Sequence, residues 1–243
     1  MPGLDWLTAR PVAHRGLHDA ESGVIENTAS AFSAAVAGNY AIECDLQIAA
    51  DGEAVVFHDD TLDRLTQQQG AVAARTAAEL KAVPFKASGD RIISLGELCD
   101  LVAGRVTLVL ELKSHFDGDR RLPRRVAEVL QNYAGPVAAM SFDPAMVAAL
   151  RDFAAGLPRG LVGQSDLVAE SGGTQSRSAY LMAALRSRPH FLAWSVRDLP
   201  AVLPLVARHV FGLSLLTWTV RSEADRKRAR RFANQMIFEG FRP

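Results

Sequence analysis

The amino-acid sequence predicts an α/β fold, namely a (β/α)8 TIM barrel with an insertion after its second strand unit. Short apolar runs alternate along the chain with stretches of helical periodicity, which is the pattern of a parallel sheet. Eight such strand units fit within 243 residues, a common length for this barrel. Because 49% of the residues are apolar, the chain can also fill a large core. We therefore expect a single domain spanning residues 1–243.

The expected strands are short apolar runs that end at turn residues or at the start of a helical stretch. They are Pro11–His14, Ala41–Ile48 continued by Ala54–His58 after an Asp51-Gly52 turn, Val106–Lys113, Val137–Ser141, Gly160–Gly163, Phe191–Val196, Leu213–Val220 and Gln235–Glu239. The run that resumes after the Asp51-Gly52 turn forms a hairpin with its predecessor, so that the two count as one unit.

The expected helices lie between these strands, and the first two of them repeat apolar residues on one face at a helical spacing. They are Ala29–Gly38, Leu122–Tyr133, Pro144–Phe153, Tyr180–Arg186, Leu199–Arg208 and Glu223–Ala233. Asp143 followed by Pro144 is a typical helix start. The basic run Arg221–Arg231 is acidic early and basic late, as a helix dipole favours, and we interpret it as a solvated helix face rather than a phosphate or membrane patch.

One segment interrupts this alternation. Residues Asp59–Leu98 separate the second and third strand units with a long mixed stretch that includes an alanine-rich helical piece. Loops of this length in compact domains are usually functional or disordered. The segment leaves the end of a strand, so we expect an insertion that is either a lid over the site or a surface excursion without a role.

Two carboxylates, Glu43 and Asp45, lie two residues apart in an otherwise apolar strand. Side chains at this spacing share one face of a strand, and buried unpaired carboxylates are costly. Glu111 lies near the end of the next expected strand, which suggests a third ligand. Three oxygen ligands suit one hard divalent cation, Mg²⁺ or Ca²⁺, better than zinc.

Composition excludes several other classes of protein. The chain has 27 basic and 27 acidic residues, which argues against a dedicated nucleic-acid binder. It has two cysteines, Cys44 and Cys99, too few for a disulfide scaffold or a zinc site, and we expect both to be buried, inert thiols. No apolar stretch is long enough for stable membrane insertion, and the N-terminus lacks a signal-peptide core. We expect a cytoplasmic protein and leave its oligomeric state open.

Polar residues follow several of the expected strands. His14 and Arg15 end the first strand, His58 ends the hairpin, Lys113 ends the third unit and Trp218 lies near the end of the seventh. Active sites of such barrels lie where the carboxyl ends of the strands meet. Two histidines for proton transfer, carboxylates for a cation, and two cationic side chains for an anion together indicate chemistry on a phosphate ester.

The same residues form a series of short motifs. They are His14-Arg15-Gly16, Glu26-Asn27-Thr28, Glu43-x-Asp45, His58-Asp59, Glu111-x-Lys113 and Trp218-Thr219-Val220. This ordered series resembles the glycerophosphodiester phosphodiesterase family. The resemblance implies a metal-dependent TIM barrel that cleaves a small-molecule glycerophosphodiester to sn-glycerol 3-phosphate and an alcohol, either by direct attack of water or through a cyclic phosphate.

The resemblance also implies a role for each motif residue. His14 and His58 would be the acid–base pair, Glu43, Asp45 and Glu111 the metal ligands, Arg15 and Lys113 the phosphate ligands, Asn27 a supporting residue and Trp218 a surface against the glycerol. Glu26 would be structural. Two segments depart from the family pattern: Arg221 follows Trp-Thr-Val where Asn is frequent, and the last strand, 234–240, lacks the usual Gly-Val-Asp-Gly-Ile-x-Thr-Asp-like run.

Two alternatives stay open at this point. One is a related phospholipase that acts on intact phospholipids, which requires an exposed apolar rim. The other is a catalytically idle barrel that binds a phosphorylated ligand, although such a protein has no need of both histidines and all three carboxylates.

Overall fold

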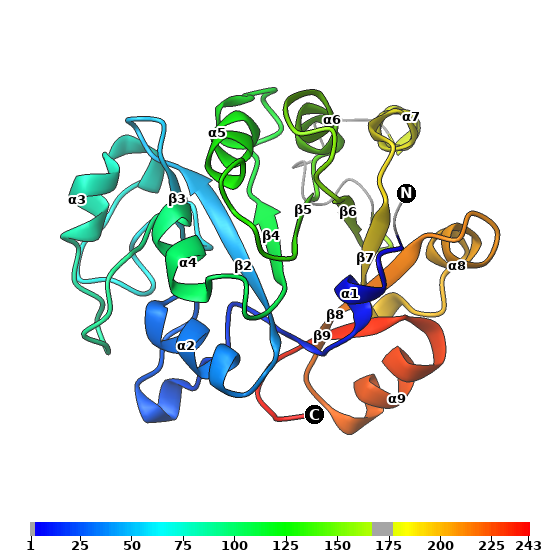
Figure 1. Ribbon diagram of the computed structural model, residues 1–243, viewed down its shortest axis with the longest axis horizontal. Coiled ribbons are helices and arrows are strands. Elements are labelled where there is room, and N and C mark those ends of the chain that lie inside the picture. Colours follow the sequence, from blue (N-terminus) through cyan, green and yellow to red (C-terminus); the bar gives the residue numbers. More distant parts are fainter. Residues whose placement is uncertain (1–2, 167–176) are drawn as a thin grey trace.

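A computed structural model describes residues 3–166 and 177–243, and its centre is a closed parallel barrel (Figure 1). Nine strands form one sheet, and β1 closes it by pairing with both β2 and β9. The strands of the barrel are β1 (Val12–Ala13), β2 (Ala41–Ile48), β4 (Leu108–Leu112), β5 (Val137–Ser141), β6 (Arg159–Gly163), β7 (Phe191–Ser195), β8 (Ser214–Val220) and β9 (Gln235–Phe238). The remaining strand, β3 (Ala54–Val56), is antiparallel to β2. The expected eight-stranded TIM barrel with its hairpin is therefore confirmed.

Helices surround the barrel (Figure 1). They are α1 (Asp5–Thr8), α2 (Ala29–Ala37), α3 (Ala77–Lys81), α4 (Leu95–Val102), α5 (Arg121–Leu130), α6 (Pro144–Phe153), α7 (Arg177–Ser187), α8 (Val202–His209) and α9 (Glu223–Phe232), with short 3-10 turns at η1 (Ala20–Ser22), η2 (Val72–Ala74) and η4 (Val196–Asp198). Asp143 accepts a hydrogen bond from the Ala145 N–H, which confirms the expected start of α6. None of these described helices is long and apolar enough to cross a membrane.

Helix α1, near the N-terminus, covers the amino end of the barrel. Helix α1 lies across this end in Figure 1, and its Leu7 is fully buried among inward-facing residues such as Val12 and Ile237. Polar residues can therefore gather only at the opposite, carboxyl end. Cys44 and Cys99 are buried as expected, and burial raises the pKa of both thiols, that of Cys99 to about 11.

The expected insertion packs beside the barrel around β3, where Figure 1 shows α3. Its apolar residues, among them Leu62, Leu80 and Phe85, share a second hydrophobic cluster with Val55 and Phe57. Helix α4 begins inside the range expected for the insertion, at Leu95, and packs on the main core. The sequence pattern did not lead us to predict this helix, although the Ser94–Glu97 capping box is a typical signal of a helix start.

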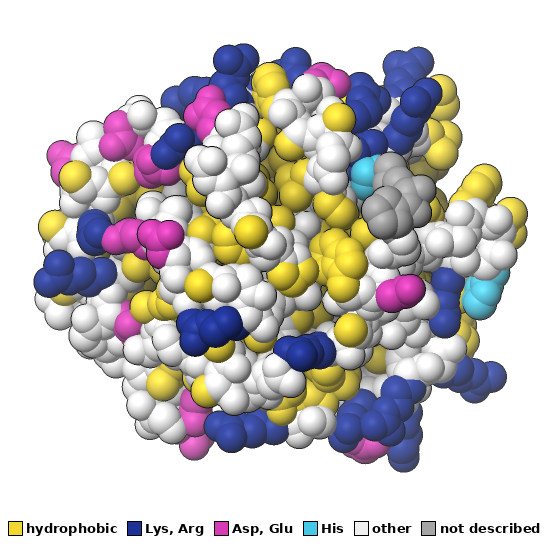
Figure 2. All heavy atoms as spheres, in the orientation of Figure 1, with side chains coloured by type: hydrophobic (Ala, Val, Ile, Leu, Met, Phe, Trp, Pro, Cys, Tyr) yellow, Lys and Arg dark blue, Asp and Glu magenta, His cyan; other side chains and the backbone are white. Residues whose placement is uncertain are grey.

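Basic side chains gather over α9 at the lower right of Figure 2. Most of this helix is exposed to solvent, and its buried residue Ala229 faces the barrel. For the helix itself, the exposure agrees with the interpretation of Arg221–Arg231 as a solvated helix face. Arg221 is an exception, because it precedes the helix and binds Glu239 at the carboxyl end of the barrel.

Candidate active site

Three carboxylates lie together on β2 and β4. The register of these strands pairs Asp45 with Glu111, and Glu43 precedes Asp45 on the same face of β2. Glu43 and Asp45 are each 1% exposed and Glu111 is 8% exposed. One oxygen from each carboxylate lies within 4.8 Å of the others. The structure thus brings together the three residues that the sequence suggested as metal ligands.

Two cations neutralise Asp45. The ammonium of Lys113 lies 2.9 Å from Asp45 Oδ1 and 2.5 Å from Glu111 Oε1, and Arg15 Nε lies 3.3 Å from Asp45 Oδ2. Burial by itself raises the pKa of Asp45, but Lys113 and Arg15 outweigh it and lower that pKa. Burial likewise lowers the pKa of Lys113, but the charges of Asp45 and Glu111 outweigh burial and raise that pKa. Asp45 and Lys113 therefore carry opposite charges in a buried pair.

Glu43 lacks such a neutralising partner. Its Oε2 accepts a hydrogen bond from the backbone N–H of Arg15 at 3.0 Å, and His14 Nε2 is 3.9 Å away. Burial, together with the charges of Asp45 and Glu111, raises the pKa of Glu43 well above its usual value. A buried, oxygen-only donor set with this excess of negative charge fits a hard divalent cation.

Asn27 holds Asp45, one of the three carboxylate residues, by two hydrogen bonds. Its amide donates to Asp45 Oδ2 at 2.8 Å and its Oδ1 accepts from the Asp45 backbone N–H at 3.2 Å. Asn27 and Arg15 both have a positive φ, 58° and 55°, a left-handed conformation that asparagine tolerates well. Asn27 does not line the cavity described below, so the structure places it as a partner of Asp45.

Both candidate histidines use Nδ1 to contact a carboxylate. His14 Nδ1 lies 2.6 Å from Glu239 Oε2, and His58 Nδ1 lies 2.7 Å from Asp59 Oδ1. The side-chain amide of Gln47 donates to the backbone carbonyls of His58 and Asp59, which holds that loop against β2. Both imidazoles border the same cavity, so the expected convergence of the strand ends is observed.

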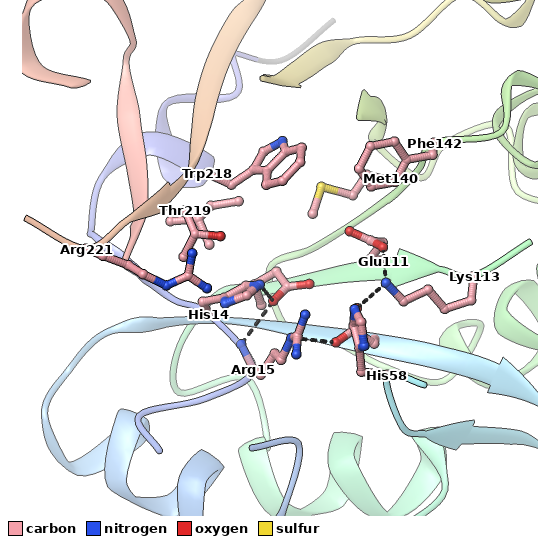
Figure 3. Close-up of a pocket in the computed structure, with 13 residues that line it drawn as sticks. His14, Arg15, His58, Glu111, Lys113, Met140, Phe142, Trp218, Thr219 and Arg221 are labelled. Atoms are coloured by element: carbon pink, nitrogen blue, oxygen red, sulfur yellow. Dashed lines mark hydrogen bonds and ion pairs between the residues drawn. The ribbon is translucent and has the colours of Figure 1, made fainter. Parts of the chain in front are cut away.

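The cavity has a volume of about 300 Å³ and one apolar and one charged side. It is lined by His14, Arg15, Glu43, Asp45, His58, Glu111, Lys113, Met140, Phe142, Trp218, Thr219, Arg221 and Ile237. Figure 3 shows Trp218, Met140 and Phe142 on one side. The ring of Trp218 packs edge-on against Phe142, with centroids 5.5 Å apart, and its indole N–H donates to the Ala193 carbonyl at 3.1 Å. The tryptophan is thereby fixed as a wall facing the charged groups.

A family model confirms the interpretation that these motifs suggested. The model described as the glycerophosphoryl diester phosphodiesterase family matches residues 14–240. The chain belongs to this family. The chain is also 31% identical over 229 residues to the glycerophosphodiester phosphodiesterase of Caldanaerobacter subterraneus subsp. tengcongensis, which covers 89% of this chain and 88% of that one.

Solved structures show the same fold. A phosphodiesterase of Oleispira antarctica, solved in complex with the product sn-glycerol-3-phosphate, superimposes with a TM-score of 0.79 at 21% identity, covering 96% of this chain and 94% of that one. The glycerophosphodiester phosphodiesterase of Thermotoga maritima has a TM-score of 0.73 at 22% identity and covers 94% of both chains. The expected enzyme class, a phosphoric diester hydrolase, is confirmed by the family and its named members.

Three residues of this phosphodiesterase site had no assigned role in the sequence. Glu239 contacts His14, Arg221 lines the cavity, and Arg64 of the insertion binds both Asp59 and Glu26. Glu26 in turn accepts a hydrogen bond from Arg15 at 2.7 Å, which explains its structural character. Glu239 could have been predicted from the sequence, because it follows the end of a barrel strand, as the other site residues do.

Proposed function

We propose that this phosphodiesterase hydrolyses small glycerophosphodiesters, such as glycerophosphocholine or glycerophosphoethanolamine, with one divalent cation, Mg²⁺ or Ca²⁺. The observation that carries the proposal is the placing of a buried carboxylate triad and two carboxylate-backed imidazoles around one cavity. The product would be sn-glycerol 3-phosphate, the molecule bound by the Oleispira antarctica relative.

Glu43, Asp45 and Glu111 would hold the cation through carboxylate oxygens. When bound, the cation would stabilise the negative charge that develops on the phosphate oxygens. Arg15 and Lys113 border the same cavity and would add positive charge beside the phosphate. Trp218 would pack against the glycerol carbons, because it presents an immobilised apolar surface opposite these charges.

His14 and His58 would transfer the protons. One imidazole would take the proton of the attacking oxygen, and the other would give a proton to the leaving alkoxide, which is a poor leaving group without it. The attacking oxygen can belong to water, which gives the product in one step with these two transfers. It can also be the 2-hydroxyl of the substrate, which gives a cyclic phosphate that water must then open, with a second pair of proton transfers between the same groups. In each imidazole the contact of Nδ1 with a carboxylate leaves Nε2 for this work.

The size of the cavity favours a deacylated substrate over an intact phospholipid. A volume of about 300 Å³ lies at the small end of small-molecule sites. The large apolar side chains exposed on the described surface lie on α7 and α8 and just beyond α8, and none of them lines the cavity. The apolar rim required by the phospholipase alternative is therefore not found among the residues that line the site.

Release of glycerol 3-phosphate tests the proposed function directly. Purified protein should release it from glycerophosphocholine when Mg²⁺ or Ca²⁺ is present, and thorough chelation should stop the release. Long-chain phosphatidylcholine, offered in mixed micelles, should be a poor substrate. Full activity after complete removal of metal would contradict the role given to the carboxylates, and faster cleavage of the intact lipid would contradict the substrate class.

A further inference from the structure

Each candidate catalytic imidazole is backed by a carboxylate that an arginine holds in turn. His58 contacts Asp59, and Arg64 binds both oxygens of that carboxylate, at 2.6 and 2.9 Å. His14 contacts Glu239, and Arg221 binds both oxygens of that carboxylate, at 3.2 and 2.8 Å. The first set lies within seven residues, 58–64, whereas the second joins residues from opposite ends of the chain.

The second set is fixed at its backbone as well as at its side chains. The His14 N–H donates to the Phe238 carbonyl at 3.0 Å, and the Glu239 N–H donates to the Val220 carbonyl at 3.0 Å. His14, Glu239 and Arg221 therefore leave three neighbouring strands, β1, β9 and β8, at a common height. Figure 3 shows the Arg221 guanidinium directed toward His14 at the border of the cavity.

We propose that Glu239, clamped by Arg221, is the positioning residue that fixes the orientation and tautomer of His14. The proposal rests on the proposed function, in which His14 transfers a proton. An ionised carboxylate can only accept hydrogen bonds, so Nδ1 of His14 must carry the proton that joins it to Glu239. In the neutral imidazole this leaves the lone pair on Nε2, the nitrogen near Glu43 and the carboxylate triad.

The surroundings of Glu239 keep it ionised. Burial alone would raise its pKa, but the hydrogen bonds and charges of His14 and Arg221 outweigh burial and lower the pKa to about 2. Arg221 also fixes the plane of the carboxylate, because its guanidinium donates to both oxygens, Oε1 at 3.2 Å and Oε2 at 2.8 Å. Both Arg221 and Glu239 lie in the two segments where this chain departs from the family pattern, and the structure shows that these departures contact each other.

The substitution Glu239→Leu gives a sharp test. Leucine has a similar size but no acceptor, so His14 Nδ1 loses the oxygen that it contacts, and the proton should move to Nε2, the tautomer that an unconstrained imidazole favours. NMR of isotope-labelled histidine at alkaline pH, with His14→Gln used for assignment, should then show the opposite tautomer in the metal-free protein. We expect kcat for glycerophosphocholine to fall by about 10²–10⁴-fold, the usual contribution of a general acid or base, with little change in KM.

Further variants separate positioning from mere loss of structure. Glu239→Asp retains the carboxylate and should keep the wild-type tautomer with an intermediate kcat. Glu239→Gln should also keep the wild-type tautomer, because its amide oxygen can take the place of Oε2, which contacts both His14 Nδ1 and Arg221. Glu223→Leu, on a side chain that is 60% exposed on α9, makes the same change as Glu239→Leu outside the site and should leave both readouts unchanged.

The outcomes distinguish this inference from the proposed function. If the wild-type protein releases no glycerol 3-phosphate, the proposed function is wrong, and the tautomer measurement still tests the contact between Glu239 and His14. If the wild type is active and Glu239→Leu keeps its tautomer and kcat, the positioning role is overturned. It is also overturned if Glu239→Asp, folded by circular dichroism, has the opposite tautomer, because its carboxylate still can only accept.

Discussion

Glu43 and Asp45 are equally buried neighbours on β2, but their partners give them opposite electrostatic situations. Asp45 is neutralised by Lys113 and Arg15 and hydrogen-bonded by Asn27. Glu43 accepts one hydrogen bond, from a backbone N–H, and its charge is repelled by those of Asp45 and Glu111. Without a bound cation, the Glu43 charge should oppose folding, whereas the Asp45 charge should support it.

The two matched substitutions Glu43→Gln and Asp45→Asn should therefore change stability in opposite directions. In metal-free protein we expect Glu43→Gln to raise the free energy of unfolding by on the order of 1 kcal/mol, because it removes an uncompensated buried charge. Asp45→Asn should lower it by about 3–5 kcal/mol, because it leaves Lys113 and Arg15 without their shared counter-charge. Urea unfolding after chelation measures both changes. Equal changes in the free energy of unfolding of the two variants would contradict the electrostatic asymmetry. Both variants should also lose most activity, because each lacks a metal ligand.

The roles of the two histidines can be separated by the leaving group of the substrate. His14→Ala and His58→Ala should each lose about 10²–10⁴-fold in kcat on glycerophosphocholine while still binding the cation, since the carboxylates remain. A nitrophenyl ester has a leaving group that needs no proton, so it should rescue the variant that lacks the general acid and leave the other impaired. Because both groups act on one transition state, the double variant should lose less than the product of the single losses. Near-normal rates for both single variants would refute the acid–base assignment.

At the scale of elements, the pattern of apolar residues located the barrel strands more accurately than it described the insertion beside β3. Strands buried on both faces are largely apolar runs, so β2, β4 and β7 could be located from the sequence. Helix α4 was missed because it lies inside an irregular stretch, where turns and short helices do not repeat a period. The insertion also forms its own apolar cluster with Phe57, a long-range contact that no local pattern reveals.

This cluster changes what deletion of the insertion should do. Removing most of Gln67–Asp90 takes away none of the eight barrel strands, so we predict that the barrel still folds. The deletion uncovers Val55 and Phe57, however, and should lower Tm. Because none of the residues 59–98 lines the cavity, we expect the change in KM to be small compared with that of a true lid. Circular dichroism and calorimetry measure the outcome, and an insoluble product would show that the segment belongs to the folding core.

Leu80→Ala is the milder control for this deletion. It removes one fully buried side chain of the cluster and leaves the chain length unchanged. A loss of about 2–5 kcal/mol is the usual cost of such a truncation. A deletion protein that is more stable than Leu80→Ala would show that the cluster contributes little to the barrel.

At the scale of the whole molecule, the site exists because the barrel closes. His14 and Glu239 are 225 positions apart and meet because β1 pairs with β9. The sequence predicted that polar residues would gather at one rim, since the carboxyl ends of all parallel strands share it. It could not predict which residues would pair at this rim. Contacts such as Glu239 with His14, or Arg64 with Glu26, depend on how side chains from distant parts of the chain are oriented.

A bound cation would join two neighbouring strands of the barrel, β2 and β4, so metal binding should stabilise the entire fold. The three ligands come from β2 and β4 and have no common geometry in the unfolded chain, so the cation should bind the folded state alone. At a hundredfold excess over Kd, such binding adds about 2.7 kcal/mol, or roughly 5–11 °C in Tm for a chain of this size. Calorimetry in Mg²⁺, Ca²⁺ or chelator measures the shift and ranks the ions. Glu43→Gln should abolish the shift and His14→Ala should retain it, since the first removes a ligand and the second leaves all three. A shift of equal size in Glu43→Gln would place the cation elsewhere on the molecule.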